Sequence, residues 1–271
     1  MYPIDDFLIK TEPNYVHQGN EASTFTAAFR ARIPLIIKGP TGCGKTRFIE
    51  YMAYSLGIPL ITVACHEDLT AADLVGRFLF KDNETVWQDG PLTLAVRYGG
   101  ICYLDEIVEA RKDTTVIIHS LTDDRRMLYV DKTGEVVKAH PSFMMVLSYN
   151  PGYQSIVKDL KESTKQRFAS LVFDYPTVEV ESRIVETESG LDADTSGRLA
   201  EMGLKIRELK GFGLDEGVSS RLLVYVGRLI NEGLTPQEAA ATAISRTLVD
   251  EREIVESIGH IVDLYFAGTD E

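Results

Sequence analysis

The sequence has no long hydrophobic run, few cysteines and fewer basic than acidic residues. A membrane-spanning helix needs about 20 consecutive apolar residues, and no segment comes near that length. Residues 1–6 have neither the basic start nor the apolar core of a signal peptide, so we expect a cytoplasmic protein. The three cysteines, Cys43, Cys65 and Cys102, show no metal-ligand spacing, which favours reduced structural thiols.

The charge balance disfavours one class of function. The chain has 28 basic and 41 acidic residues, for a formal net charge of −13. Affinity for nucleic acid rests mainly on neutralising phosphates, so a DNA or RNA translocase is disfavoured, whereas protein substrates remain open. The 271 residues suffice for one large domain or two modest ones, and they contain no internal repeat and no low-complexity linker.

A glycine-rich segment carries the strongest functional signal. It follows the apolar run 33–37 and precedes a helical pattern over residues 47–52. A G-x-x-x-x-G-K-[ST] loop between a strand and a helix binds nucleotide phosphates through backbone N–H groups, with the lysine near the β- and γ-phosphates and the hydroxyl on Mg²⁺. The expected phosphate-binding residues are Gly39, Pro40, Thr41, Gly42, Cys43, Gly44, Lys45 and Thr46.

A second motif follows at the end of another predicted strand. The apolar run 101–104 ends in Asp105 and Glu106. Ligands of parallel α/β sheets bind at the carboxyl ends of the strands. We expect Asp105 to hold Mg²⁺ and Glu106 to orient or deprotonate the attacking water, which predicts hydrolysis of a nucleoside triphosphate. The alternative is that the two carboxylates only cap the next helix.

The order of predicted elements indicates an α/β fold. Strands alternate with helices and suggest a five-stranded parallel sheet covered on both faces. Residues 75–88 and 127–138 each look like a β-hairpin inserted into this pattern. The strand candidates are residues 33–38, 60–65, 101–106, 144–149 and 170–175.

The C-terminal part of the sequence is predicted to be helical. Thr235, Pro236 and Glu238 form a capping box with proline at the first helical position, which predicts a helix start. Residues 222–230 carry an apolar stripe at helical spacing. We therefore divide the chain into a nucleotide-binding domain over residues 1–178 and a helical lid domain over residues 179–271.

Three further polar residues are candidates for the site. Asn150 follows the strand candidate 144–149, where its amide could contact the attacking water or the γ-phosphate, although Asn150-Pro151 is equally typical of a turn. Arg167 ends a helical stretch just before the last strand candidate. Arg221 lies in the first turn of a helix, where a cation opposes the helix dipole unless an anion such as phosphate compensates.

These motifs together resemble a known group, the AAA+ ATPases of the MoxR branch. The resemblance is densest to the CbbQ/NirQ/NorQ family and, within it, to the CbbQ members that power bacterial Rubisco activases. It covers about residues 30–250. The segments that carry it are Gly39–Phe48, Thr62–His66, Asp73–Arg77, Leu104–Lys112 and Ser148–Tyr153.

The resemblance implies a homo-hexameric ring that binds ATP and Mg²⁺ between protomers. Asn150 would be sensor one, Arg221 sensor two, and Arg167 an arginine finger reaching the neighbour's γ-phosphate. Gln166 stands before that arginine, where many MoxR relatives have an acidic residue. The two hairpins would line the working face or central pore, with Leu128 or Tyr129 transmitting movement. The implied partners are a CbbO-type adaptor with a von Willebrand factor A domain and Rubisco as the client.

Two other functions stay open. The same type of motor could serve maturation of nitric oxide reductase, which differs only in its client. A P-loop small-molecule kinase is the third possibility, but such an enzyme has no use for an arginine finger in trans or for a separate helical domain.

Overall fold

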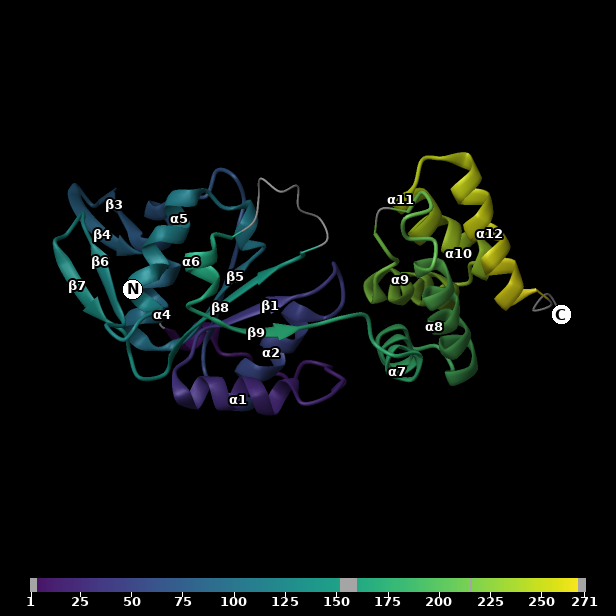
Figure 1. Ribbon diagram of the computed structural model, residues 1–271, viewed down its shortest axis with the longest axis horizontal. Coiled ribbons are helices and arrows are strands. Elements are labelled where there is room, and N and C mark those ends of the chain that lie inside the picture. Colours follow the sequence, from purple (N-terminus) through teal and green to yellow (C-terminus); the bar gives the residue numbers. More distant parts are fainter. Residues whose placement is uncertain (1–3, 152–159, 215, 268–271) are drawn as a thin grey trace. The chain divides into compact units, whose positions relative to one another are not determined.

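The computed structural model describes residues 4–151, 160–214 and 216–267. The chain forms two compact units (Figure 1). The sheet unit comprises residues 1–15, 19–39 and 45–173, and the helical unit comprises residues 16–18, 40–44 and 174–271. Within the described part of the chain, no helix is long and apolar enough to cross a membrane.

The sheet unit is built on a five-stranded parallel sheet, as predicted. Its strand order is β2-β5-β8-β1-β9, so the strand that precedes the phosphate loop lies beside two partners, β8 and β9. Both flanking strands therefore end near the loop. The strands are β1 (Leu35–Lys38), β2 (Leu60–Ala64), β5 (Gly100–Asp105), β8 (Phe143–Tyr149) and β9 (Ala169–Val172).

The strand boundaries differ from the prediction mainly at β1 and β9. β1 begins at Leu35 rather than residue 33, because Pro34 has no N–H to donate and only its carbonyl pairs, with the Ala169 N–H at 3.0 Å. β9 ends at Val172 rather than residue 175. Pro176 lies shortly beyond, where a residue without an N–H cannot extend the ladder.

Helices cover both faces of the sheet, so the central strands β1, β5 and β8 are buried on both sides. On one face, Ile36, Leu104 and Leu147 pack in a core with α4 (Pro91–Tyr98). On the other, Phe48 of α2 (Lys45–Leu56) packs against Phe25 of α1 (Glu21–Ala31), with ring centroids 5.7 Å apart. The continuous burial along β8 is typical of a central parallel strand.

Short helices fill the connections of the sheet unit. The 3-10 helices span Ile4–Phe7, Ile107–Glu109 and Ile118–Leu121, and the short α-helices are α3 (Ala71–Val75), α5 (Lys112–Ile117) and α6 (Glu162–Lys165).

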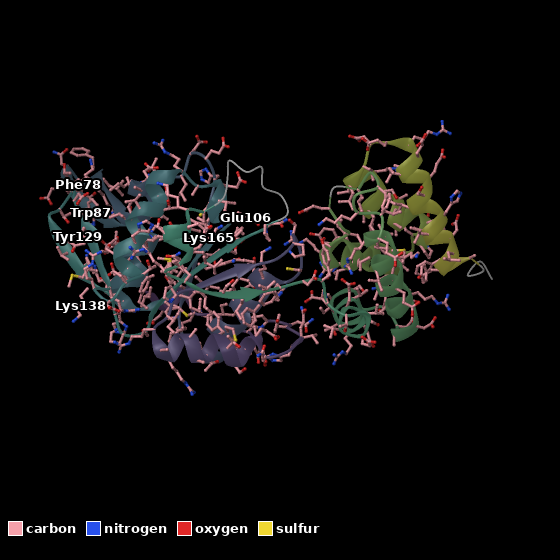
Figure 2. All side chains as sticks on the ribbon, viewed as in Figure 1. Phe78, Trp87, Glu106, Tyr129, Lys138 and Lys165 are labelled. Atoms are coloured by element: carbon pink, nitrogen blue, oxygen red, sulfur yellow. The ribbon has the colours of Figure 1, made fainter. Side chains whose placement is uncertain are left out.

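Both predicted hairpins form. The first pairs β3 (Gly76–Lys81) with β4 (Glu84–Asp89), and the second pairs β6 (Met127–Val130) with β7 (Glu135–Lys138). Labelled side chains of both hairpins lie on the side of the sheet unit away from Glu106 (Figure 2).

One arginine joins the two hairpins. The Arg97 guanidinium of α4 donates to Asp89 at the end of β4 (Nε–Oδ2 3.0 Å) and, through both Nη groups, to Glu135 of β7 (2.7 and 2.9 Å). These bonds lower the pKa of the Glu135 carboxyl. Because a bidentate arginine fixes direction as well as distance, the hairpins are held in one arrangement.

The helical unit has its own hydrophobic core, with Leu199, Val226 and Ile258 at its centre. The predicted capping box is confirmed, since the Thr235 hydroxyl accepts from the Glu238 N–H and the Glu238 carboxylate accepts from the Thr235 N–H. The helices are α7 (Val178–Ser189), α8 (Ala193–Arg207), α9 (Ser220–Asn231), α10 (Pro236–Ala240), a π-helical turn (Ala241–Ser245), α11 (Arg246–Leu248) and α12 (Arg252–Phe266).

Candidate functional site

The glycine-rich loop has the backbone geometry that phosphate binding requires. It leaves β1 and enters α2 at Lys45. Gly42 and Gly44 have φ values of 71° and 97°, a region that side chains with a Cβ rarely occupy. Lys45 is only 6% exposed, and its Nζ donates to the Gly39 carbonyl at 2.8 Å. The loop thus curls around its own lysine, next to a 12-residue helix whose N-terminus favours anions.

Asp105 ends β5 and faces the first residues of α2. Its Oδ1 accepts hydrogen bonds from the Tyr103 hydroxyl at 2.8 Å and from the Ser148 hydroxyl. Its Oδ2 lies 3.5 Å from the Thr46 hydroxyl. Because two protein donors occupy one oxygen, the other is the one left to face a cation beside Thr46.

Tyr103 and Ser148 are functional candidates that the sequence prediction missed. Both lie in apolar strands, and each has a recognisable signal. Tyr103 is two residues before Asp105, so their side chains share a face of β5. Ser148 is fully buried in the neighbouring strand β8, and a buried hydroxyl needs a partner. Burial raises the pKa of Tyr103, so this hydroxyl stays protonated and donates.

Glu106 turns out of the strand through an unusual backbone conformation. Its φ of 53° and ψ of 47° lie in the left-handed region, which is uncommon for a residue other than glycine. This lets Glu106 reach the same edge as Asp105 although neighbouring strand residues point to opposite faces. Its side chain makes no capping hydrogen bond to the helix that follows, so the capping alternative is not supported.

The electrostatics around Glu106 suit a general base. Burial raises the pKa of its carboxyl, opposed by the charge of Lys45 and by a hydrogen bond from the Asn150 backbone, and reinforced by Asp105. Its N–H lies 3.3 Å from the Ser148 hydroxyl oxygen. A carboxylate with a raised pKa is a stronger base than an exposed one, as proton abstraction from water requires.

Asn150 reaches the same edge of the sheet. It follows β8, which pairs with β5 with Leu147 opposite Leu104, and it is 6% exposed. The structure therefore brings it beside Glu106, as expected, while its sensing role stays a prediction. Residues 152–153 of the neighbouring family-like segment lie outside the described residues.

Arg167 follows α6 and lies apart from this cluster, where a different carboxylate supports it. Its Nη1 lies 3.6 Å from Asp123 Oδ2 and 3.4 Å from the His119 carbonyl oxygen. Its Nε is buried and has no partner among the described residues. Asp123 thus supplies the acidic contact that Gln166 cannot. These contacts are long, so neither holds the guanidinium tightly.

Arg221 belongs to the helical unit. It is the second residue of α9, after the cap that Ser219 forms by accepting from the Leu222 N–H. Its side chain is exposed. The cation at a helix N-terminus is confirmed; its proposed phosphate contact stays a prediction.

The phosphate loop and the residues around Asp105 fit a nucleoside triphosphate with Mg²⁺. The loop offers backbone donors and a buried lysine for phosphate, and Thr46 with Asp105 Oδ2 offers hard oxygen ligands. Mg²⁺ keeps several waters and takes one or two protein ligands beside phosphate oxygens. The described residues contain no group of three or more His, Cys, Asp or Glu side chains that could hold a metal ion.

Family comparisons agree with this geometry. Residues 34–168 match the AAA domain of the dynein-related subfamily, and residues 181–265 match the CbbQ/NirQ/NorQ C-terminal family. The chain is 58% identical to protein CbbQ of Hydrogenophilus thermoluteolus, covering 97% of this chain and 98% of that protein. It is 54% identical to protein NorQ of Paracoccus denitrificans, covering 94% of each chain, and 53% identical to the denitrification regulatory protein NirQ of Pseudomonas aeruginosa, covering 94% and 98%.

Solved structures are similar in fold at low sequence identity. A mutant of RuvB from Thermotoga maritima has a TM-score of 0.59 and 14% identity, covering 97% of this chain and 76% of that one. A protein described as an ATPase from Cytophaga hutchinsonii has a TM-score of 0.52 and 13% identity, covering 90% and 81%. At such identities the likeness concerns the fold alone.

Proposed function

The chain belongs to the CbbQ/NirQ/NorQ family of AAA+ ATPases, and from this premise we propose that it is the motor subunit of a Rubisco activase. In this proposal it forms a homo-hexameric ring and acts through a CbbO-type adaptor with a von Willebrand factor A domain. The ring would release inhibitory sugar phosphates from Rubisco. The 58% identity to CbbQ over nearly the whole of both chains is the observation that supports this client.

The proposed chemistry rests on how the protein holds Asp105. Bound ATP with Mg²⁺ supplies the phosphoanhydride and the charge that makes its phosphorus electrophilic. Lys45 and the loop amides would bind the phosphates, and Thr46 with Asp105 would hold the cation. Tyr103 and Ser148 keep Asp105 in place through its Oδ1.

Glu106 takes the proton from the attacking water, and the Asn150 backbone holds its carboxylate in place. Arg167 extends toward the site of the neighbouring protomer, and Arg221 contacts the phosphates from the helical domain, here taken as residues 179–271. The long contacts of Arg167 in cis are compatible with a side chain that finds its main partner in trans.

In this proposal the hairpins transmit the movement driven by ATP hydrolysis. Phe80, Val86 and Tyr129 are exposed on them, and Arg97 ties the two hairpins together. Leu128, one of two residues expected to transmit movement, is fully buried, because alternate residues of β6 face the core. Tyr129, which is 46% exposed, is therefore the residue to change.

The test is recovery of carboxylation from a Rubisco–inhibitor complex. We expect recovery with the matched adaptor and ATP, none with Glu106→Gln, and none without the adaptor. Tyr129→Ala should hydrolyse ATP but release less inhibitor, whereas Phe212→Ala, an exposed aromatic of the helical unit, should do both normally. Full recovery without ATP, or none with the matched adaptor and Rubisco, contradicts the assignment.

A second client is favoured by a specific observation. The chain is also 53–54% identical to NirQ and NorQ proteins over 94% of its length. If carboxylation is not recovered, the same preparation should be tested for activation of nitric oxide reductase. Activation of nitric oxide reductase would identify that enzyme as the client instead of Rubisco.

A further inference from the structure

A buried ion pair forms the polar centre of the helical unit. Glu181 of α7 is fully buried, and the side chain of Arg207, the last residue of α8, is 9% exposed. The two groups bond in bidentate fashion, with Arg207 Nη1 donating to Glu181 Oε2 at 2.7 Å and Nη2 to Oε1 at 2.6 Å. This pair lies within the helical unit and is outside the proposed nucleotide chemistry.

The same two side chains also form hydrogen bonds with residues just before Arg221. Arg207 Nε donates to the Val218 carbonyl at 2.8 Å, and the Ser220 hydroxyl donates to Glu181 Oε1. Tyr175 completes the cluster: the Arg207 guanidinium lies 4.1 Å from its ring centroid, and its hydroxyl donates to the Gly217 carbonyl at 3.0 Å. Residues 217, 218 and 220 are thus all held by one buried network.

We propose that Arg207 and Glu181 are positioning residues that fix the start of α9 and, through it, Arg221. Helix starts fray unless they are tied down, and a cation near the N-terminus opposes the helix dipole. The serine cap at Ser219 satisfies only one of the free N–H groups at the start of α9. The buried pair fixes the turn on its inner side, so that exposed Arg221 projects in one direction.

The chemistry of the pair supports a geometric role. Removing two charges from water is costly, and an apolar pair of similar volume is often as stable. A bidentate arginine–carboxylate pair adds a fixed direction that an apolar pair lacks. The catalytic part of this inference rests on the proposed role of Arg221, whereas the structural part does not.

The first experiment measures hydrogen exchange of the backbone amides of residues 219–223. Glu181→Met/Arg207→Met removes both charges while keeping apolar volume, so its thermal midpoint should stay near that of the unmodified protein. Exchange at the start of α9 should nevertheless rise by about tenfold or more. Arg207→Lys keeps the charge but cannot form the bidentate pair, so its exchange rate at the start of α9 should be intermediate.

Two controls separate positioning from general loosening. Arg228→Met removes the arginine that contacts Glu188 from the other end of α9. Val262→Ala opens a cavity in the core of the same unit, at a residue 2% exposed. Neither should raise exchange in residues 219–223 above the change seen across the rest of the unit. Exchange that is unchanged in the Met/Met variant overturns the proposal.

The second experiment is a mutant cycle on ATP turnover. The Met/Met variant and Arg221→Ala should each lower turnover by about tenfold or more, since a misplacement of about 1 Å can cost about 100-fold. The triple variant should be no slower than Arg221→Ala alone, because the pair acts through Arg221. Effects that multiply overturn the proposal.

Hydrogen exchange and ATP turnover together distinguish a wrong role for Arg221 from a wrong role for the buried pair. If Arg221→Ala leaves both turnover and ATP affinity unchanged, the assigned role of Arg221 fails, and with it the catalytic part of the inference. The exchange result then still decides whether the pair fixes α9.

Discussion

The sheet unit and the helical unit hold their candidate functional residues by different means. In the sheet unit, Asp105 and Glu106 lie where a buried strand ends, and Lys45 begins the helix after the phosphate loop. Hydrogen bonds to strand or loop residues hold all three. In the helical unit, a buried charge pair contributed by two helices holds the start of a third. A parallel sheet therefore gathers functional residues at one edge by its topology alone, whereas a helix bundle needs a dedicated long-range contact.

The largest loss of ATP hydrolysis is expected from Arg167. This residue lies in the sheet unit but apart from Lys45, Asp105 and Glu106. Arg167→Ala should bind ATP almost normally and hydrolyse it ~10³-fold more slowly, because a trans arginine stabilises the charge of the transition state. Steady-state hydrolysis and equilibrium ATP binding measure the two parts.

Mixed assemblies provide the control for a site shared between protomers. Mixing Arg167→Ala with Lys45→Ala should restore part of the activity, since some interfaces then pair an intact loop with an intact arginine. Absence of recovery despite confirmed co-assembly argues against a contribution in trans.

A smaller loss is expected from Ser148→Ala. Asp105 would lose one of the two donors that fix its Oδ1, and the Glu106 N–H would lose its hydroxyl partner. Supporting groups around a metal site typically contribute 10- to 100-fold, and we expect turnover to fall by about that factor. Thr93→Ala removes another fully buried hydroxyl of the same unit and should leave turnover unchanged. Equal losses in both variants would show a general packing effect.

The pH dependence should reflect the raised pKa of Glu106. A general base works when ionised, so kcat/KM should fall as the pH drops through a pKa above the ordinary value of a glutamate. The free energy of unfolding depends on pH in the opposite direction from kcat/KM. The folded state binds this proton more tightly than the unfolded state, so the contribution of Glu106 is present at low pH and is lost as the pH rises through the folded pKa. Glu106→Gln should therefore be at least as stable as the unmodified protein at neutral pH, as thermal unfolding at two pH values would show. An acidic limb at the ordinary glutamate value would contradict the burial of this carboxyl.

The smallest effect should come from the helical unit's capping box. Thr235→Ala removes the cap of α10 and should lower the stability of the unit by about 1 kcal/mol, whereas Thr235→Ser keeps it. Turnover should not change at a temperature where both variants are folded, because this cap lies at α10 rather than at the start of α9. Thermal unfolding and hydrolysis measured on the same samples check both statements.

Features that are local in sequence could be predicted. The phosphate loop, the strand that ends in Asp105 and the two hairpins each have their own pattern of glycines, apolar runs and turn residues. The capping box of α10 is equally local.

Contacts that join distant segments of the chain could not be predicted from the sequence. Nothing near Asp105 indicates that Ser148 lies beside it, because that contact depends on β5 and β8 being neighbours in the sheet. The pairing of Glu181 with Arg207 likewise depends on how two helices pack, since both residues look like solvated charges on their own helices. The left-handed conformation of Glu106 could not be predicted, because a glutamate carries no local signal for it.

We propose that the site separates phosphate binding, at Lys45, from water activation, at Glu106. This separation is tested most directly by measuring equilibrium ATP binding and single-turnover hydrolysis in Glu106→Gln and Lys45→Ala. We expect Glu106→Gln to bind ATP like the unmodified protein and to hydrolyse it about 10²- to 10⁴-fold more slowly, and Lys45→Ala to lose both binding and hydrolysis. Equal loss of ATP binding in the two variants, or hydrolysis by Glu106→Gln at the unmodified rate, would contradict it.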